Sequence, residues 1–112
     1  MTWKTLYERL GGLDEAAFPV AFNDVDYCLR LQEAGYRIIF TPHAQLYHHE
    51  SASRGRDLSA DQQARAAREI ATVRRKWRSR LQYDPYYNPN LSYRRPDFSL
   101  TDAPRVRRPW VR

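Results

Sequence analysis

The spacing of apolar residues predicts two helices in the first third of the chain. A short helix is expected over residues 5–10, ended by Gly11 and Gly12, because glycine readily takes the positive φ of a helix C-terminus. A second helix is expected over residues 24–34, with Asn23 as its N-cap. Its apolar side chains recur at helical spacing and predict a buried stripe. These are Phe22, Val25, Cys28 and Leu29.

A third, longer helix is predicted in the second half of the chain. Ser59 is followed three residues later by Gln62, which is the pattern of a capping box at a helix N-terminus. The helix is expected to run to about residue 80. Its apolar positions again predict one buried side. They are Ala67, Ile70, Val73, Trp77 and Leu81.

Between the second and third helices, the pattern changes to that of β-strands. Residues 36–41 are rich in β-formers and end at Pro42, and residues 44–49 alternate in polarity. Gly35, just before them, suits the position that follows a helix C-cap. The sequence therefore predicts a short β-hairpin over residues 36–49.

The C-terminal part of the chain differs in composition from the rest. Residues 82–112 contain five of the seven prolines, four tyrosines and no glycine. We expect this part to be an extended tail that is rich in proline, tyrosine and arginine. Two regions are thus predicted, a folded one over residues 1–81 and a tail over residues 82–112.

The net charge of +6 points to an anionic partner, since the arginines gather in the second half of the chain. Seven cations lie between Arg65 and Arg80, opposed in that stretch by Glu69 alone. They predict either peripheral contact with an anionic membrane or a plain solvated face. A single cysteine, Cys28, excludes an internal disulfide, and no long apolar run or leader pattern is found. We therefore expect a cytoplasmic protein, with the inner face of the membrane as an alternative location.

Three polar clusters carry the candidate chemistry. They are Gly11-Gly12-Leu13-Asp14-Glu15, Asn23-Asp24-Val25-Asp26, and His48-His49-Glu50-Ser51-Ala52-Ser53-Arg54-Gly55. Acidic side chains at the start of a helix and imidazoles at the end of a strand can serve as a general base and as ligands of a divalent metal. We expect the three clusters to line one pocket.

The order of these clusters, with the Ala-Gly-Tyr-Arg-Ile and Thr-Pro-His-Ala segments between them, resembles the second half of family 2 glycosyltransferases. The resemblance covers residues 10–55 and is strongest to rhamnosyltransferase-like bacterial enzymes of O-antigen and other cell-surface polysaccharide synthesis. Residues 84–92, Asp-Pro-Tyr-Tyr-Asn-Pro-Asn-Leu-Ser, resemble the terminal segment of the same group.

The resemblance implies an α/β fold, a partial GT-A (Rossmann-like) fragment with two or three helices, a hairpin and the extended tail. It also implies transfer of a sugar, with rhamnose as one candidate, from a nucleotide-sugar donor to a cell-surface polysaccharide or a lipid-linked glycan. Inverting members use a single displacement, commonly with a divalent metal, Mn²⁺ or Mg²⁺. The donor-binding half with its Asp-x-Asp motif is not in this sequence, so we expect the chain alone to be inactive.

Matched residue by residue, the resemblance implies that Asp24 is the general base, with Asp26 as the second choice. Residues that are two positions apart on a helix, as Asp24 and Asp26 are, lie about 200° apart around its axis. The two carboxylates therefore cannot face the same acceptor. Asp26 is expected to cap the first turn of its helix instead. A simpler alternative is that both acids complement the helix dipole.

The resemblance also implies that His48, or failing that His49, contacts the metal. The remaining implied contacts go to the acceptor or to the donor phosphates. They are Asp14, Glu15, Ser53 and Arg54. For each of these a structural role, in a tight turn, at a sheet edge or on a solvated loop, is the alternative.

Two other kinds of function remain open at this point. The arginine-rich helix and the tyrosines of the tail could form a small nucleic-acid-binding module, although the acidic clusters do not favour it. A chain without its donor half would also leave apolar surface uncovered, which predicts self-association or a missing partner.

Overall fold

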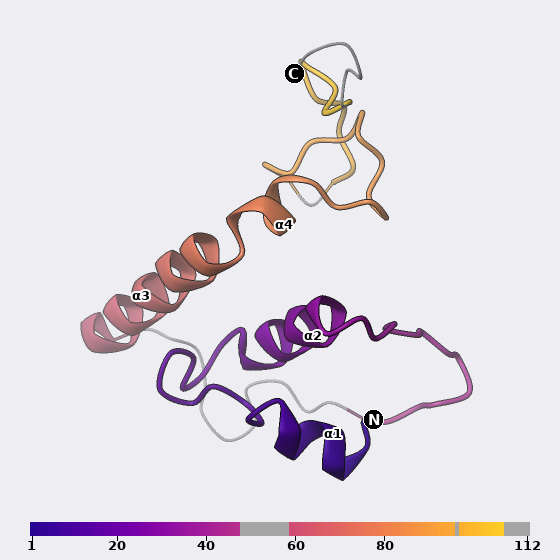
Figure 1. Ribbon diagram of the computed structural model, residues 1–112. Helices are drawn as coiled ribbons and strands as arrows, with labels where there is room; N and C mark the ends of the chain where they lie inside the picture. Colours follow the sequence, from indigo (N-terminus) through magenta and orange to yellow (C-terminus); the bar gives the residue numbers. More distant parts are fainter. Residues whose placement is uncertain (48–58, 96, 107–112) are drawn as a thin grey trace. The chain divides into compact units, whose positions relative to one another are not determined.

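The computed structural model describes residues 1–47, 59–95 and 97–106. The helices found in these ranges are Lys4–Arg9 (α1), Asn23–Glu33 (α2), Ala60–Lys76 (α3) and Arg78–Gln82 (α4) (Figure 1). The chain divides into two compact units, Met1–Trp77 (unit 1) and Arg78–Arg112 (unit 2). The boundary predicted between residues 81 and 82 falls inside α4. Within the described ranges, no helix is both long enough and apolar enough to cross a membrane.

Helix α1 ends as its two glycines predict. Gly11 and Gly12 have φ of 78° and 65°. Their amides donate to the carbonyls of Glu8 and Tyr7, the paired hydrogen bonds that close a helix with a left-handed turn. A side chain at Gly12 would lie 3.0 Å from the Tyr7 ring, so glycine is required there for space as well as for φ.

Helix α2 begins one residue earlier than predicted, and Asn23 is not its N-cap. The N-cap is Phe22, which has a left-handed φ of 66° and packs against the core of unit 1. Packing of this ring fixes the turn, so no capping side chain is used. At the other end, Gly35 is confirmed as the residue after the C-cap, with φ of 84°. Val25, predicted to be buried, is 40% exposed, and the buried side of α2 carries Asp26, Tyr27 and Leu31.

Helix α3 begins with the predicted capping box, because Ser59 and Gln62 exchange hydrogen bonds. It ends at Lys76 rather than near residue 80, and Trp77 separates it from α4. The predicted stripe is wrong in part, since Ala67, Ile70 and Leu81 are exposed. The buried residues on this side are Glu69, Val73 and Trp77.

The core of unit 1 explains why the buried side of α3 differs from the predicted one. Phe18, fully buried in the irregular segment after α1, packs against Val73 and Trp77. The carboxylate of Glu69 accepts a hydrogen bond from the backbone N–H of Ala21, so this acid is buried with a partner. The contacts that orient α3 therefore come from a segment with no helical pattern of its own.

The first predicted strand, over residues 36–41, is not formed. These residues are exposed and have no regular secondary structure, with Ile39 75% and Phe40 92% exposed. The described part of the second predicted strand, residues 44–47, is also not a strand. A two-stranded hairpin is marginal by itself in water, and the described residues offer no sheet for it to join.

Unit 2 is a compact set of turns rather than the extended tail that was predicted. Leu91 and Leu100 form an antiparallel bridge, flanked by a hydrogen bond from the N–H of Thr101 to the carbonyl of Asn90. The guanidinium of Arg105 lies 3.4 Å from the centre of the Tyr93 ring. Stacked side chains and turn hydrogen bonds thus fold this proline-rich segment back on itself.

Candidate functional site

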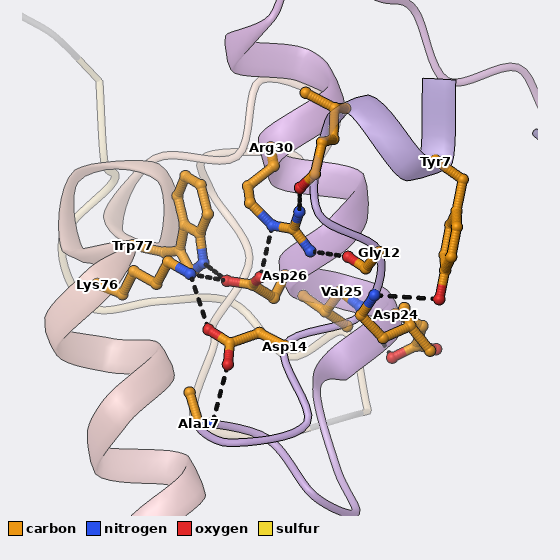
Figure 2. Close-up of polar contacts among 12 residues, drawn as sticks. Tyr7, Gly12, Asp14, Ala17, Asp24, Val25, Asp26, Arg30, Lys76 and Trp77 are labelled. Atoms are coloured by element: carbon orange, nitrogen blue, oxygen red, sulfur yellow. Dashed lines mark hydrogen bonds and ion pairs between the residues drawn. The ribbon is translucent and has the colours of Figure 1, made fainter. Parts of the chain in front are cut away.

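Among the described residues of unit 1, the side chain of Asp26 lies at the centre of a polar cluster (Figure 2). It is fully buried. Its Oδ1 accepts a hydrogen bond of 2.8 Å from the indole N–H of Trp77 and lies 2.8 Å from Nζ of Lys76. Its Oδ2 accepts a hydrogen bond of 2.8 Å from Nε of Arg30. Both oxygens are therefore occupied, and Asp26 does not cap the first turn of α2 as predicted.

Arg30 extends this cluster to the end of α1. Its two terminal nitrogens donate to the backbone carbonyls of Leu10 and Gly12. One guanidinium thus satisfies carbonyls in the glycine turn while it pairs with Asp26 on its own helix. This arrangement fixes the turn after α1 against the first half of α2.

Lys76 connects the same cluster to Asp14. Its ammonium lies 3.6 Å from Oδ2 of Asp14, while Oδ1 of Asp14 accepts a hydrogen bond of 2.9 Å from the N–H of Ala17. The carboxylate that was predicted to contact the acceptor therefore supports the turn that leads to Phe18. We call the five joined side chains the Asp26 network. They are Asp14, Asp26, Arg30, Lys76 and Trp77.

The Asp26 network holds its central carboxyl in the ionised form. Burial by itself would raise the pKa of Asp26, but the hydrogen bonds from Lys76, Trp77 and Arg30 outweigh it. The pKa lies below its ordinary value of 3.8. A carboxylate with a lowered pKa and two occupied oxygens is a poor acceptor for a substrate proton.

Unit 1 is expected to lose stability in acid because of this lowered pKa. The ionised Asp26 stabilises the fold fully above the ordinary carboxyl pKa of 3.8, and this contribution disappears as the pH falls through the lower pKa of the folded state. The indole N–H resonance of Trp77 should report the titration with a midpoint below 3.8. The Trp3 resonance, from a side chain that is 81% exposed, serves as the internal control. A Trp77 midpoint at or above 3.8 would contradict the assignment.

Asp24 lies outside the Asp26 network and faces solvent. Its Oδ1 accepts a hydrogen bond of 2.8 Å from the N–H of Val25 in the first turn of α2. The helical spacing predicted that Asp24 and Asp26 face different ways, and the burial of one and the exposure of the other confirm it. Glu15, the other predicted acceptor contact, is also exposed. Asp24 is therefore the one of the two α2 candidates whose carboxylate an outside molecule can reach.

The remaining predicted contacts lie outside the described residues. They are His48, His49, Ser53 and Arg54. The expected pocket between Asp24 and an imidazole is therefore still a prediction. Within the ranges that the structure describes, no group of three or more His, Cys, Asp or Glu side chains could hold a metal ion. The engagement of both Asp26 oxygens with cations and an indole also makes that residue unsuitable as a ligand.

Sequence reasoning missed the partners that surround Asp26. The spacing of Asp26 and Arg30, four residues apart on one helix, is a local signal that could have indicated their pairing. Lys76 and Trp77 have no such signal, because about half the chain separates Trp77 from Asp26. The sequence predicted for Glu69 only that it offsets the positive charge of the basic face. In the structure its carboxylate is 2% exposed and accepts a hydrogen bond from the backbone N–H of Ala21.

Comparison with known proteins places this chain beside segments of much longer bacterial proteins. No protein-family model matches it, and no solved structure matches it. It is 45% identical over 98 residues to uncharacterized protein y4gI of Sinorhizobium fredii. The matched region covers 88% of this chain and 11% of that protein. It is 39% identical over 109 residues to O-antigen biosynthesis protein RfbC of Myxococcus xanthus. The matched region covers 90% of this chain and 8% of that protein.

A third similarity covers a shorter part of the chain. The N-acetylglucosaminyl-diphospho-decaprenol L-rhamnosyltransferase of Mycobacterium tuberculosis is 37% identical over 54 residues, which are 48% of this chain and 17% of that protein. The chain thus spans less than a fifth of the length of each of these relatives. It is similar to a short segment of each relative, and two of these relatives are named as an O-antigen biosynthesis protein and as a rhamnosyltransferase.

Proposed function

We propose that this chain is the acceptor-side part of a family 2, GT-A type glycosyltransferase, rhamnosyltransferase-like in its substrates. In the complete enzyme it serves the transfer of a sugar from a nucleotide-sugar to a cell-surface polysaccharide or a lipid-linked glycan. Similarity to the M. xanthus and M. tuberculosis proteins supports the reaction class. The observation that carries the proposal is the exposed carboxylate of Asp24 at the first turn of α2, a helix that the buried Asp26 network holds in place.

The chemistry assigned to Asp24 is that of a general base. The acceptor hydroxyl gives its proton to the carboxylate while its oxygen bonds to the anomeric carbon of the donor sugar. The bond from that carbon to the nucleoside diphosphate breaks on the opposite face, so the configuration inverts. Asp26 is unsuited to this role because its oxygens already accept bonds from Trp77 and Arg30.

We propose a divalent metal ion for the complete enzyme only. If Mn²⁺ or Mg²⁺ takes part, His48 is the proposed ligand of this chain, with His49 second, and the ion would neutralise charge on the leaving diphosphate. The described residues do not form a metal site by themselves. No step assigned here to Asp24 depends on the ion.

The proposal also gives a role to the apolar segment over residues 36–41. Three consecutive apolar side chains, Ile38, Ile39 and Phe40, are exposed. A run of this kind is typical of a strand that is covered on both faces of a sheet. We assign the missing sheet to the donor-binding half, which the complete enzyme supplies.

A segment exchange tests the proposed function. In M. xanthus lacking RfbC, we expect O-antigen to be restored by RfbC in which the matched segment is replaced by this chain, because the catalytic base and its support would be retained. The isolated chain, incubated with nucleotide-sugars and Mn²⁺, is expected to transfer no sugar. O-antigen is measured on gels of extracted lipopolysaccharide, and chimera abundance by immunoblot. An abundant chimera without O-antigen, or clear turnover by the isolated chain, would overturn the proposal.

A further inference from the structure

The residues that α3 buries determine which side of the helix faces solvent. Glu69, Val73 and the adjoining Trp77 are buried against the rest of unit 1. The opposite side of the helix is exposed. It presents three arginines interspersed with alanines, Gln63 and Ile70, and we call it the α3 arginine face. Its residues are Gln63, Ala64, Ala67, Arg68, Ile70, Ala71, Arg74 and Arg75.

The cations of this face form no ion pair with the part of the fold that the structure describes. Arg65 and Lys76, on the other side of α3, pair with Glu69 and Asp26 inside unit 1. Arg68, Arg74 and Arg75 are exposed and form no ion pair with any described residue. The helix dipole explains a preference for cations in the last turn of α3, but Arg68 lies outside that turn.

We propose that the α3 arginine face docks on an anionic phospholipid surface. This inference rests on the proposed function, since a lipid-linked glycan acceptor is presented at a membrane. Ile70 and the alanines would lie at the level of the headgroups, and the long arginine side chains between and beside them would reach the lipid phosphates. Each cation near an anionic leaflet contributes roughly a fivefold gain in partitioning, so three contribute about 100-fold.

The composition of the face favours lipid over nucleic acid. Proteins that bind single strands use aromatic platforms for base stacking, and α3 contains no aromatic residue. A phosphate backbone would also leave Ile70 and the alanines of this face without an apolar partner. Asp61, in the first turn, is the one exposed acid of α3, so the rest of the helix presents no negative charge to an anionic bilayer.

Co-sedimentation with vesicles tests the docking. The whole chain is mixed with vesicles of equal parts phosphatidylcholine and phosphatidylglycerol, and with vesicles of phosphatidylcholine alone. We expect binding to the anionic vesicles that weakens with salt. The R68Q/R74Q/R75Q variant should bind them about 100-fold more weakly. The R37Q/R94Q/R95Q variant, which removes the same charge from exposed arginines elsewhere, should lose far less.

Several results would overturn the inference. They are equal losses in the two triple variants, equal binding to both kinds of vesicle, and tighter arginine-dependent binding of an oligonucleotide than of anionic vesicles. Circular dichroism verifies that both variants keep the helical content of the parent chain. Vesicle binding requires no sugar transfer. If it depends on the α3 arginine face while the chimera makes no O-antigen, the docking stands and the proposed transfer alone fails.

Discussion

Replacing Asp26 by alanine is expected to lower the free energy of unfolding of unit 1 by about 3–5 kcal/mol, because removal of one partner of a buried ion pair leaves the other charge uncompensated. Arg30 would lose its counter-ion, Lys76 would keep Asp14 alone, and the indole N–H of Trp77 would lose its acceptor. Such a loss is a large part of the roughly 4–12 kcal/mol expected for a unit of this size. Urea unfolding followed by circular dichroism measures it.

Two further variants separate the charge of Asp26 from its hydrogen bonds. Asp26→Asn keeps an acceptor for Trp77 but removes the charge, so its loss of stability should be smaller than that of Asp26→Ala. Asp24→Ala, at the exposed neighbour on the same helix, is the matched control and should change stability little. If Asp24→Ala and Asp26→Ala destabilise equally, the Asp26 network is not what holds α2.

Replacing Asp24 by asparagine is expected to lower sugar transfer by the chimera by about 10²–10⁴-fold, the usual contribution of a general base. Asparagine has nearly the shape of aspartate but cannot take a proton at neutral pH. The abundance of the chimera should not change, since Asp24 is exposed and lies outside the Asp26 network. The rate of transfer into O-antigen, divided by chimera abundance, is the quantity to measure.

The control for this prediction is another exposed carboxylate on the same helix. Glu33→Gln, at the last residue of α2, removes the same charge at the opposite end of the helix and should leave transfer unchanged. If Glu33→Gln is as damaging as Asp24→Asn, a change in the charge of α2 explains both effects. In that case the assignment of Asp24 as the base is wrong.

Features that depend on neighbouring residues could be predicted from the sequence. The glycine turn after α1, the role of Gly35 and the capping box of Ser59 are local, because each joins residues within one or two turns. The opposite directions of Asp24 and Asp26 follow from helix geometry alone. These predictions needed no knowledge of the rest of the fold.

Features that depend on distant partners could not be predicted in the same way. The rotation of α3 is set by Phe18, which lies in a segment without periodicity, and the α2 N-cap is set by the packing of Phe22. The pattern of residues 36–41 indicates a strand, but a strand requires a neighbour that the described residues do not contain. The sequence offered Asp24 and Asp26 as alternative bases, whereas the structure shows that Asp24 is exposed and that Asp26 is buried in contact with Trp77, Lys76 and Arg30.

The separation of Asp26 and Trp77 by 51 positions bears on the order in which the protein can fold. A chain leaving the ribosome exposes α2 first and acquires Lys76 and Trp77 only after all of α3 has been translated. Until then Arg30 is the one cation of the network that is available to Asp26. The contacts of Asp26 with Lys76 and Trp77 are thus among the last of unit 1 to become available. Long-range contacts of this kind slow folding.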